Sequence, residues 1–219
     1  HSLQHHFADM QQQRETATLG MWLFLVTEIM FFGGMFCAYL VYRIAHFNDF
    51  ASASQTLDIR LGAINTAVLI CSSLTMALAV HAAQKGHRRR LIIFLALTMV
   101  LGSAFLGIKA IEYADKFEHH HVPGPSFHFE GKVVGHPEMD VNTWHAQLFF
   151  SLYFAMTGMH ALHMVIGVGL LAMLVVYGWR GRYSPQYHTP VENVGLYWHF
   201  VDIVWIFLFP LLYLISRHQ

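Results

Sequence analysis

Charged residues are scarce in this sequence. They make up 12% of its 219 residues, and 13 cationic side chains balance 13 acidic ones. This balance argues against a nucleic-acid partner, and a mean hydropathy of +0.42 is too apolar for an ordinary soluble domain. Cysteine is scarce as well, because only Cys37 and Cys71 occur, each alone inside an apolar run. This isolation disfavours a disulfide or a cysteine-ligated zinc site.

Several motifs of soluble enzymes are missing. The sequence contains no glycine-rich phosphate loop, no Gly-x-Ser-x-Gly and no Cys-x-x-Cys segment, so nucleotide binding and nucleophilic catalysis have no support. Residues 1–13 are polar and contain no apolar h-region, so we expect no signal peptide here. The chain does not begin with Met, and we expect a few residues upstream.

Five apolar runs dominate the chain, and each is long enough to cross a membrane as a helix. A hydrocarbon core of about 30 Å needs about 20 apolar residues. The sequence therefore predicts an all-α integral membrane bundle of five transmembrane helices, in a single membrane domain over residues 1–219. The expected spans are residues 18–43, 61–83, 91–113, 148–177 and 194–215, with a connecting loop over 46–60 and an extramembrane loop or small cap over about 117–142.

Lys and Arg residues between the spans indicate the orientation, because cytoplasmic loops carry an excess of them. Seven cations lie on the side of the N-terminus and five on the other, while Lys109 lies inside a span. The seven are Arg14, Lys85, Arg88, Arg89, Arg90, Arg180 and Arg182. We therefore expect a cytoplasmic N-terminus, with the C-terminus and the long loop on the periplasmic side.

Glu28 is an acidic residue near the middle of the first expected span. A carboxyl at this depth costs several kcal/mol unless it is protonated, paired or turned toward other helices, so we expect Glu28 to point inward. Three interpretations remain open. They are a proton-relay or coupling site, a polar anchor for a neighbouring subunit or lipid headgroup, and a protonated acid bonded to a Ser, Thr or His of the bundle.

Polar residues in the other spans favour contacts between helices. His160 and His163 share one helical face, as do His199 and Asp202, which invites a haem or metal site. Two ligands three residues apart cannot occupy opposite axial positions of one haem, so we favour hydrogen bonds across the bundle, with His199 bonded to Asp202 or a neighbour.

Three further polar residues in the spans fit the same interpretation. Asn65 suits a contact between helices, and Lys109 can pair with Glu112 on one helical face. A run of adjacent histidines, His119, His120 and His121, with His128 and His136 nearby, makes a poor metal site because its rings cannot surround one ion. We therefore expect no metal on this chain.

Three segments of the chain carry a recognisable pattern. Residues 197–208 read Tyr-Trp-His-Phe-Val-Asp-Ile-Val-Trp-Ile-Phe-Leu, residues 27–32 read Thr-Glu-Ile-Met-Phe-Phe, and residues 157–163 read Thr-Gly-Met-His-Ala-Leu-His. They resemble, in that order, the last-helix signature, the Ser/Thr-Glu-x-x-Phe-Phe motif and the Gly-x-His-x-x-His segment of subunit III of cytochrome c oxidase, in the haem-copper oxidase superfamily. Asn65 to His81 and the pair Glu112-Tyr113 fit the intervening helices. The match runs from Thr18 onward and is similar to the five-helix bacterial form, which lacks the first two helices of seven-helix members.

The resemblance implies a subunit without redox centres in the bacterial cytoplasmic membrane. It would pack directly on catalytic subunit I, which carries the haems and copper, beside other oxidase subunits, in a complex that passes electrons from cytochrome c to O2. Its implied roles are support of proton uptake and protection of subunit I during turnover. A respiratory supercomplex is a further candidate partner. Subunit III of a quinol oxidase or a nitric-oxide-reductase-associated relative is an alternative, and a haem-bearing membrane cytochrome subunit is a more distant one.

The resemblance also implies a set of site residues and no catalytic residue or cofactor on this chain apart from bound phospholipid. The acid that matches Glu28 is the carboxyl modified by a hydrophobic carbodiimide and lies near tightly bound phospholipid. The implied lipid-binding or proton-related residues are Glu28, His81, Arg180, Arg182, Glu192 and His199.

Overall fold

The computed structural model describes residues 9–118, 122–124, 127, 129, 131–134 and 136–215. The run His119, His120 and His121 and the neighbouring His128 lie outside the described residues.

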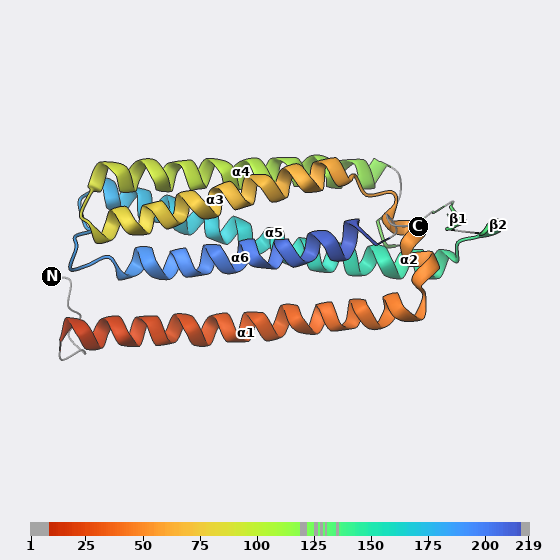
Figure 1. The fold of residues 1–219 in the computed structure, drawn as a ribbon, viewed down its shortest axis with the longest axis horizontal. Helices are drawn as coiled ribbons and strands as arrows, with labels where there is room; N and C mark the ends of the chain where they lie inside the picture. The colour runs from red at the N-terminus through yellow and green to blue at the C-terminus, as the bar shows by residue number, and fades with distance from the viewer. Residues whose placement is uncertain are drawn as a thin grey trace. The chain divides into compact units, whose positions relative to one another are not determined.

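Five long helices make up most of the described chain (Figure 1). They are α1 (Met10–Ala45), α3 (Ile59–Gln84), α4 (Arg88–Glu118), α5 (Thr143–Trp179) and α6 (Thr189–Tyr213). Each is long and apolar enough to cross a membrane, because even the 25 residues of α6 extend for about 37 Å at 1.5 Å per residue. The all-α fold class and the five candidate spans are confirmed.

The segment expected as a connecting loop after the first span contains a helix, α2 (Phe47–Ser54). Its sequence ends in four small residues, Ala-Ser-Ala-Ser, and Phe50, which precedes them, is fully buried against Tyr39 and Phe149, with ring centroids 5.9 and 5.5 Å away. The small Ala and Ser side chains let α2 lie close to its neighbours. The sequence predicted a loop here because the segment is polar and rich in small residues.

The segment expected as an extramembrane loop or small cap over about 117–142 lies between Glu118, where α4 ends, and Thr143, where α5 begins. Within it, β1 (Lys132–Val133) and β2 (His136–Asp140) pair antiparallel, with Lys132 opposite Asp140. The described part of this segment therefore contains a small two-stranded ribbon.

The chain divides into two compact units, and each takes residues from all five long helices. The first unit is His1–Met30, Val68–Ala104 and His163–Ile203, and the second is Phe31–Ala67, Phe105–Leu162 and Val204–Gln219. A single membrane domain over residues 1–219 stays a prediction.

The core of the first unit is organised around Trp198 of α6, which is fully buried. Its indole lies against Gly102 of α4 and Gly167 of α5, where a Cβ atom would come within 2.5 and 2.9 Å of the ring, respectively. The indole Nε1 donates a hydrogen bond of 3.1 Å to Ser72 Oγ on α3. Two glycines and one hydroxyl thus form a slot for this fully buried tryptophan.

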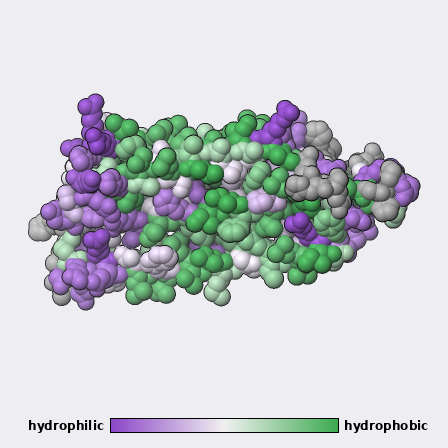
Figure 2. Space-filling model, in the orientation of Figure 1, coloured by the Kyte–Doolittle hydropathy of each residue, from purple (hydrophilic) through white to green (hydrophobic). Residues whose placement is uncertain are grey.

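The surface of the long helices is apolar, as a lipid environment requires. Large hydrophobic side chains such as Met30, Ile111 and Val165 are more than half exposed. Figure 2 shows hydrophobic side chains, in green, over much of the visible helical surface, and hydrophilic ones, in purple, gathered toward helix ends. Exposed apolar area of this extent marks a membrane or protein contact surface.

Candidate functional site

In the first unit, Glu28 of α1 contacts a histidine of α5. Glu28 Oε2 lies 3.1 Å from His163 Nε2, and the two side chains are 20% and 10% exposed. Tyr197 of α6 donates a hydrogen bond of 2.9 Å to the His163 carbonyl oxygen, and its ring is stacked with the imidazole. The acid therefore reaches helix α5 while one-fifth of its side chain stays accessible at the helix surface, which suits both a polar anchor and a proton-accepting group.

Glu192, in the first turn of α6, joins three helices of the first unit. Its carboxylate lies 3.2 Å from the Arg14 guanidinium of α1 and accepts a hydrogen bond of 2.8 Å from the Gln84 amide of α3. His188 Nε2 lies 3.2 Å from the same carboxylate. An acid in the first turn also interacts favourably with the positive end of its helix. Glu192 thus links the ends of α1, α3 and α6. Its ion pair with Arg14 was not predicted from the sequence.

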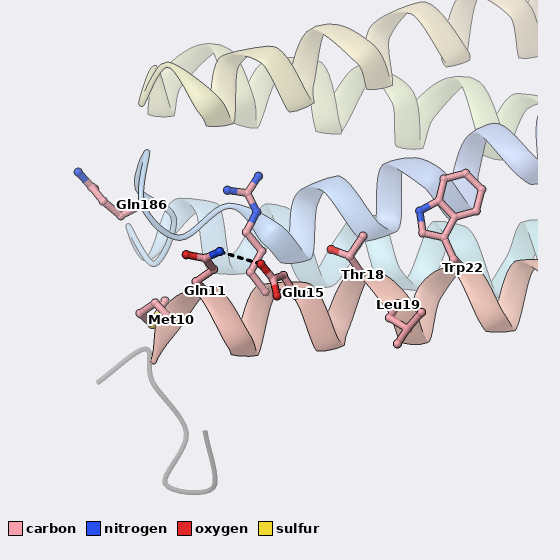
Figure 3. A pocket seen from close by; sticks show the side chains of 8 residues that line it. Met10, Gln11, Glu15, Thr18, Leu19, Trp22 and Gln186 are labelled. Carbon is pink, nitrogen blue, oxygen red and sulfur yellow. Dashed lines mark hydrogen bonds between the residues drawn. The ribbon is translucent and has the colours of Figure 1, made fainter. Parts of the chain in front are cut away.

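A surface pocket of about 710 Å³ lies along the start of α1, beside the Arg14–Glu192 ion pair. Figure 3 shows its lining, in which Gln11, hydrogen-bonded to Glu15, lies toward the start of α1, and Leu19 and Trp22 lie further along the helix. Gln186, in the loop before α6, lies at the end of the lining away from Trp22. Arg14 completes the lining and also pairs with Glu192. A polar mouth followed by an apolar stretch suits an amphiphilic molecule with a headgroup and a chain.

Of the other predicted lipid or proton residues, His199 is the most enclosed. Its Nδ1 lies 2.7 Å from Ser73 Oγ of α3, so its partner is a neighbouring hydroxyl, while Asp202 is buried at 3% exposure one turn later. His81 is exposed at the end of α3. Arg180 is exposed, and the Arg182 guanidinium lies 4.6 Å from the centre of the Tyr177 ring. The structure does not bring these four side chains to one point.

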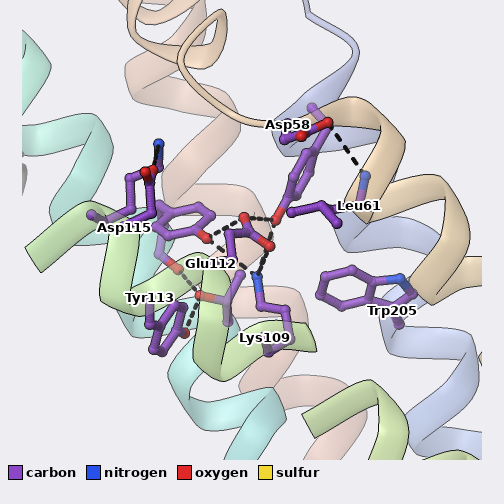
Figure 4. Close-up of polar contacts among 12 residues, drawn as sticks. Asp58, Leu61, Lys109, Glu112, Tyr113, Asp115 and Trp205 are labelled. Atoms are coloured by element: carbon purple, nitrogen blue, oxygen red, sulfur yellow. Dashed lines mark hydrogen bonds and ion pairs between the residues drawn. The ribbon is translucent and has the colours of Figure 1, made fainter. Parts of the chain in front are cut away.

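In the second unit, Lys109 and Glu112 form a buried ion pair of 3.0 Å, with both side chains 3% exposed. Two tyrosine hydroxyls complete it. Tyr153 OH donates to Glu112 Oε1 at 2.7 Å, Tyr213 OH donates to the same oxygen, and Lys109 Nζ lies within 3.2 Å of both hydroxyls. Figure 4 shows Glu112 and Lys109 pointing toward one another, with the Trp205 ring beside the lysine. This network joins α4, α5 and α6 of the second unit and is structural.

The two remaining helix-contact residues of the second unit differ from one another. The His160 ring packs edge-on against Phe105, at 5.5 Å, and tilted against Trp205, at 5.3 Å. Asn65 is fully buried, and its amide makes no hydrogen bond within the described residues, so its role in a contact between helices stays a prediction. The hydroxyl of the neighbouring Thr66 accepts a hydrogen bond of 3.0 Å from Trp205 Nε1 of α6.

The histidines of the spans are therefore engaged separately. His163 contacts Glu28, His199 contacts Ser73, and His160 packs against aromatic rings. Across the described residues, no three His, Cys, Asp or Glu side chains are grouped so that they could hold a metal ion. That this chain itself carries no haem or metal stays a prediction.

Comparison with known proteins adds the biological context. The family model described as cytochrome c oxidase subunit III matches residues 4–130 and 140–217. Cytochrome c oxidase subunit 3 of Thermostichus vulcanus is 32% identical over 201 residues, which cover 91% of this chain and 87% of that protein. Cytochrome bo(3) ubiquinol oxidase subunit 3 of Pseudomonas aeruginosa is 30% identical over 221 residues, with 99% and 93% covered.

A vertebrate relative shows how this chain differs in length. Cytochrome c oxidase subunit 3 of Gallus gallus is 30% identical over 200 residues, which cover 89% of this chain but 67% of the chicken protein. The relatives with matching length are bacterial, in agreement with the shorter, five-helix form that the sequence motifs indicated.

Proposed function

The chain belongs to the cytochrome c oxidase subunit III family, and we propose that it is the non-catalytic third subunit of a bacterial oxidase that passes electrons from cytochrome c to O2. As a member of this family it is a multi-pass membrane subunit of a multi-subunit haem-copper respiratory oxidase. The observation that carries the proposal is the family match over both parts of the chain, which include all five candidate spans.

We propose that the haems and copper belong to partner subunits and that this chain packs directly on catalytic subunit I. The contacts of His163 with Glu28 and of His199 with Ser73 support this assignment, since each of these imidazoles has a polar partner on a neighbouring helix of the first unit. The chain's own contribution is then to bind lipid and to support proton uptake and stability during turnover. In the proposed orientation the N-terminus is cytoplasmic and the C-terminus periplasmic.

Glu28 is the residue that supports the lipid and proton roles most directly. Its carboxyl is bonded to His163 and is still one-fifth exposed, so it can exchange a proton or contact a bound lipid without moving. The pocket lined by Trp22 and Leu19, nearer the start of the same helix, offers apolar side chains to a lipid chain.

A quinol oxidase is the second candidate, because relatives of almost the same similarity carry that name. Quinol oxidase subunit 3 of Bacillus spizizenii is 31% identical over 216 residues, close to the value for the cytochrome c oxidase relative. The two candidates differ in the electron donor, which other subunits of the complex bind.

Purification of the chain from its native membrane in mild detergent tests the proposal. We expect haem-copper subunits and phospholipid to accompany it in fixed ratio, and no Soret band on this chain after dissociation. Oxidation of reduced cytochrome c by the complex would support the first candidate, and oxidation of quinol alone would support the second. A chain that purifies alone and keeps its own haem would contradict both.

Replacing Glu28 by Gln is expected to leave the oxidase assembled, because the amide keeps a hydrogen bond to His163 while it loses the titratable proton. We expect normal haem content per complex but faster loss of activity during sustained turnover, measured as the decay of O2 consumption. Glu118→Gln, which changes an exposed acid at the end of α4, is the matched control and should behave like the wild type. Failure of Glu28→Gln to assemble would show that the acid is structural.

A further inference from the structure

Two histidines of the second unit are stacked face to face beside α2. His46 lies between α1 and α2, and His145 lies in the first turn of α5. Their ring centroids are 3.7 Å apart, and the angle between the ring planes is 24°. Both residues are half-buried. We call this contact the histidine stack. It joins the corner between α1 and α2 to the start of α5, which lies far from it in the sequence.

One carboxylate serves both rings of the histidine stack. Asp49 Oδ2, in the first turn of α2, lies 2.6 Å from His145 Nδ1. The other carboxylate oxygen accepts a hydrogen bond of 3.4 Å from the backbone N–H of Asn142. Within the part of the chain that the structure describes, the imidazole of His46 forms no ion pair and no hydrogen bond that caps α2. The stack therefore has two titratable rings and a single counter-charge.

The surroundings of the histidine stack disfavour a second positive charge. His46 directly precedes α2 and His145 lies in the first turn of α5, so each ring is near the positive end of a helix dipole. Arg43, three residues before His46 on α1, is half-buried and adds a further cation. Lys132 of β1, the strand that contacts α2, is already paired with an acid of β2. Asp49 is thus the acid available to the stack.

The charge of the histidine stack depends on pH, because histidine changes its charge between about pH 5 and pH 8. With one proton on the two rings, the Asp49 carboxylate neutralises the group. A second proton makes the group positive and places two cationic rings face to face. At this separation, two unit charges repel each other enough to shift an equilibrium by about sevenfold in water, and by more at a half-buried site.

We propose that the histidine stack is a pH-dependent contact, closed at neutral pH and opened when both rings are protonated. Because the closed contact disfavours the second proton, its contribution to stability is lost as the pH falls below about 6.5, where histidine ordinarily titrates. In the proposed orientation this end of the bundle is periplasmic, so the contact responds to pH on that side of the membrane.

Opening of the histidine stack is local. Phe50 stays fully buried against Tyr39 and Phe149, so the second half of α2 keeps its place. The backbone hydrogen bonds that open are those of the corner itself. The Phe50 N–H donates to the His46 carbonyl oxygen at 3.1 Å, and the His46 N–H donates to the Tyr42 carbonyl oxygen at 2.9 Å. Exchange of these amide hydrogens with solvent deuterium therefore reports the opening.

Hydrogen–deuterium exchange of the purified oxidase complex, read by mass spectrometry of the peptide that contains α2, tests the proposal. Exchange is measured at about pH 7.5 and about pH 5.5, on either side of the ordinary histidine titration, and corrected for the intrinsic pH dependence of amide exchange. We expect the wild type to lose about tenfold in protection at the lower pH. His46→Phe keeps a ring in the stack but cannot take up a proton, so its protection should not change with pH. His87→Gln, which changes an exposed histidine between α3 and α4, is the matched control and should respond like the wild type.

A second variant tests the counter-charge. In Asp49→Asn a single proton already makes the stack positive, so the loss of protection should begin at a higher pH than in the wild type. An unchanged onset would overturn the role of Asp49 as the counter-charge. Equal protection of the wild type at both pH values overturns the whole proposal, and so does a His46→Phe variant that loses protection as the wild type does. If His46→Phe does not accumulate, His46→Gln is measured in its place and should also show no change with pH. The haem spectrum of the same preparation reports oxidase assembly separately.

Discussion

Replacing Glu112 by Leu is expected to destabilise the protein by about 3–5 kcal/mol, because it leaves the buried Lys109 ammonium without its carboxylate. Both side chains are only 3% exposed, so water cannot take the place of the lost acid. The two tyrosine hydroxyls that donate to Glu112 would lose their acceptor as well. Thermal unfolding of the purified complex and the amount of the chain in membranes measure the effect.

The paired variant Lys109→Met/Glu112→Leu separates the charge from the packing. Replacing a buried ion pair by apolar residues of similar size is often neutral, so the paired variant should recover the part of the loss that comes from the unpaired ammonium, while the two tyrosine hydroxyls still lack their acceptor. Asp140→Asn is the matched control, since its ion pair with Lys132 is 82% and 58% exposed and should contribute less than about 1 kcal/mol. A paired variant as unstable as Glu112→Leu would show that the packing of the tyrosines around Lys109 and Glu112 depends on the ions themselves.

This network also shows how far sequence reasoning reaches. Lys109 and Glu112 are three residues apart on one helix, so their pairing follows from helical geometry alone. Tyr153 and Tyr213 lie 41 and 101 residues from Glu112 in the chain, and their approach depends on the rotation and register of three helices. Hydropathy predicts that a helix spans the membrane but not which of its faces meets which neighbour.

The same distinction applies to the candidate site. A lone acid in a span predicts that Glu28 turns toward other helices, since lipid cannot solvate it. Its partner His163 lies 135 residues away, and Arg14 lies 178 residues from Glu192. The motifs that resemble subunit III did indicate Glu28, His163 and Glu192, but not these contacts. Helix α2 was missed for a different reason, because a short buried helix of small residues has the same composition as a loop.

Replacing Trp198 by Ala is expected to cost about 3 kcal/mol, the lower end of the range for a buried aromatic side chain. We expect the lower end because lipid tails are as apolar as the protein core, so burial of the indole gains little from the hydrophobic effect. The loss of stability comes mainly from the cavity that the indole leaves and from its missing van der Waals contacts. The indole is fully buried between Gly102 and Gly167 and bonds Ser72, so three helices of the first unit lose a common partner. Thermal unfolding of the purified complex measures this loss.

A second change tests the slot from its other side. Gly102→Leu places a side chain where even a Cβ would come within 2.5 Å of the indole, so it should destabilise the wild type by about 1–3 kcal/mol or more. In the Trp198→Ala background the same leucine fills the space that the indole has left, and the combined variant should be more stable than the sum of the two single effects predicts.

Gly107→Leu, where a Cβ would meet no atom within 4 Å, is the matched control and should change stability little. Strictly additive effects of Gly102→Leu and Trp198→Ala would mean that the glycine does not shape the slot. The glycines would then serve only the approach of the helix backbones, and the position of Trp198 would depend on its hydrogen bond to Ser72 instead.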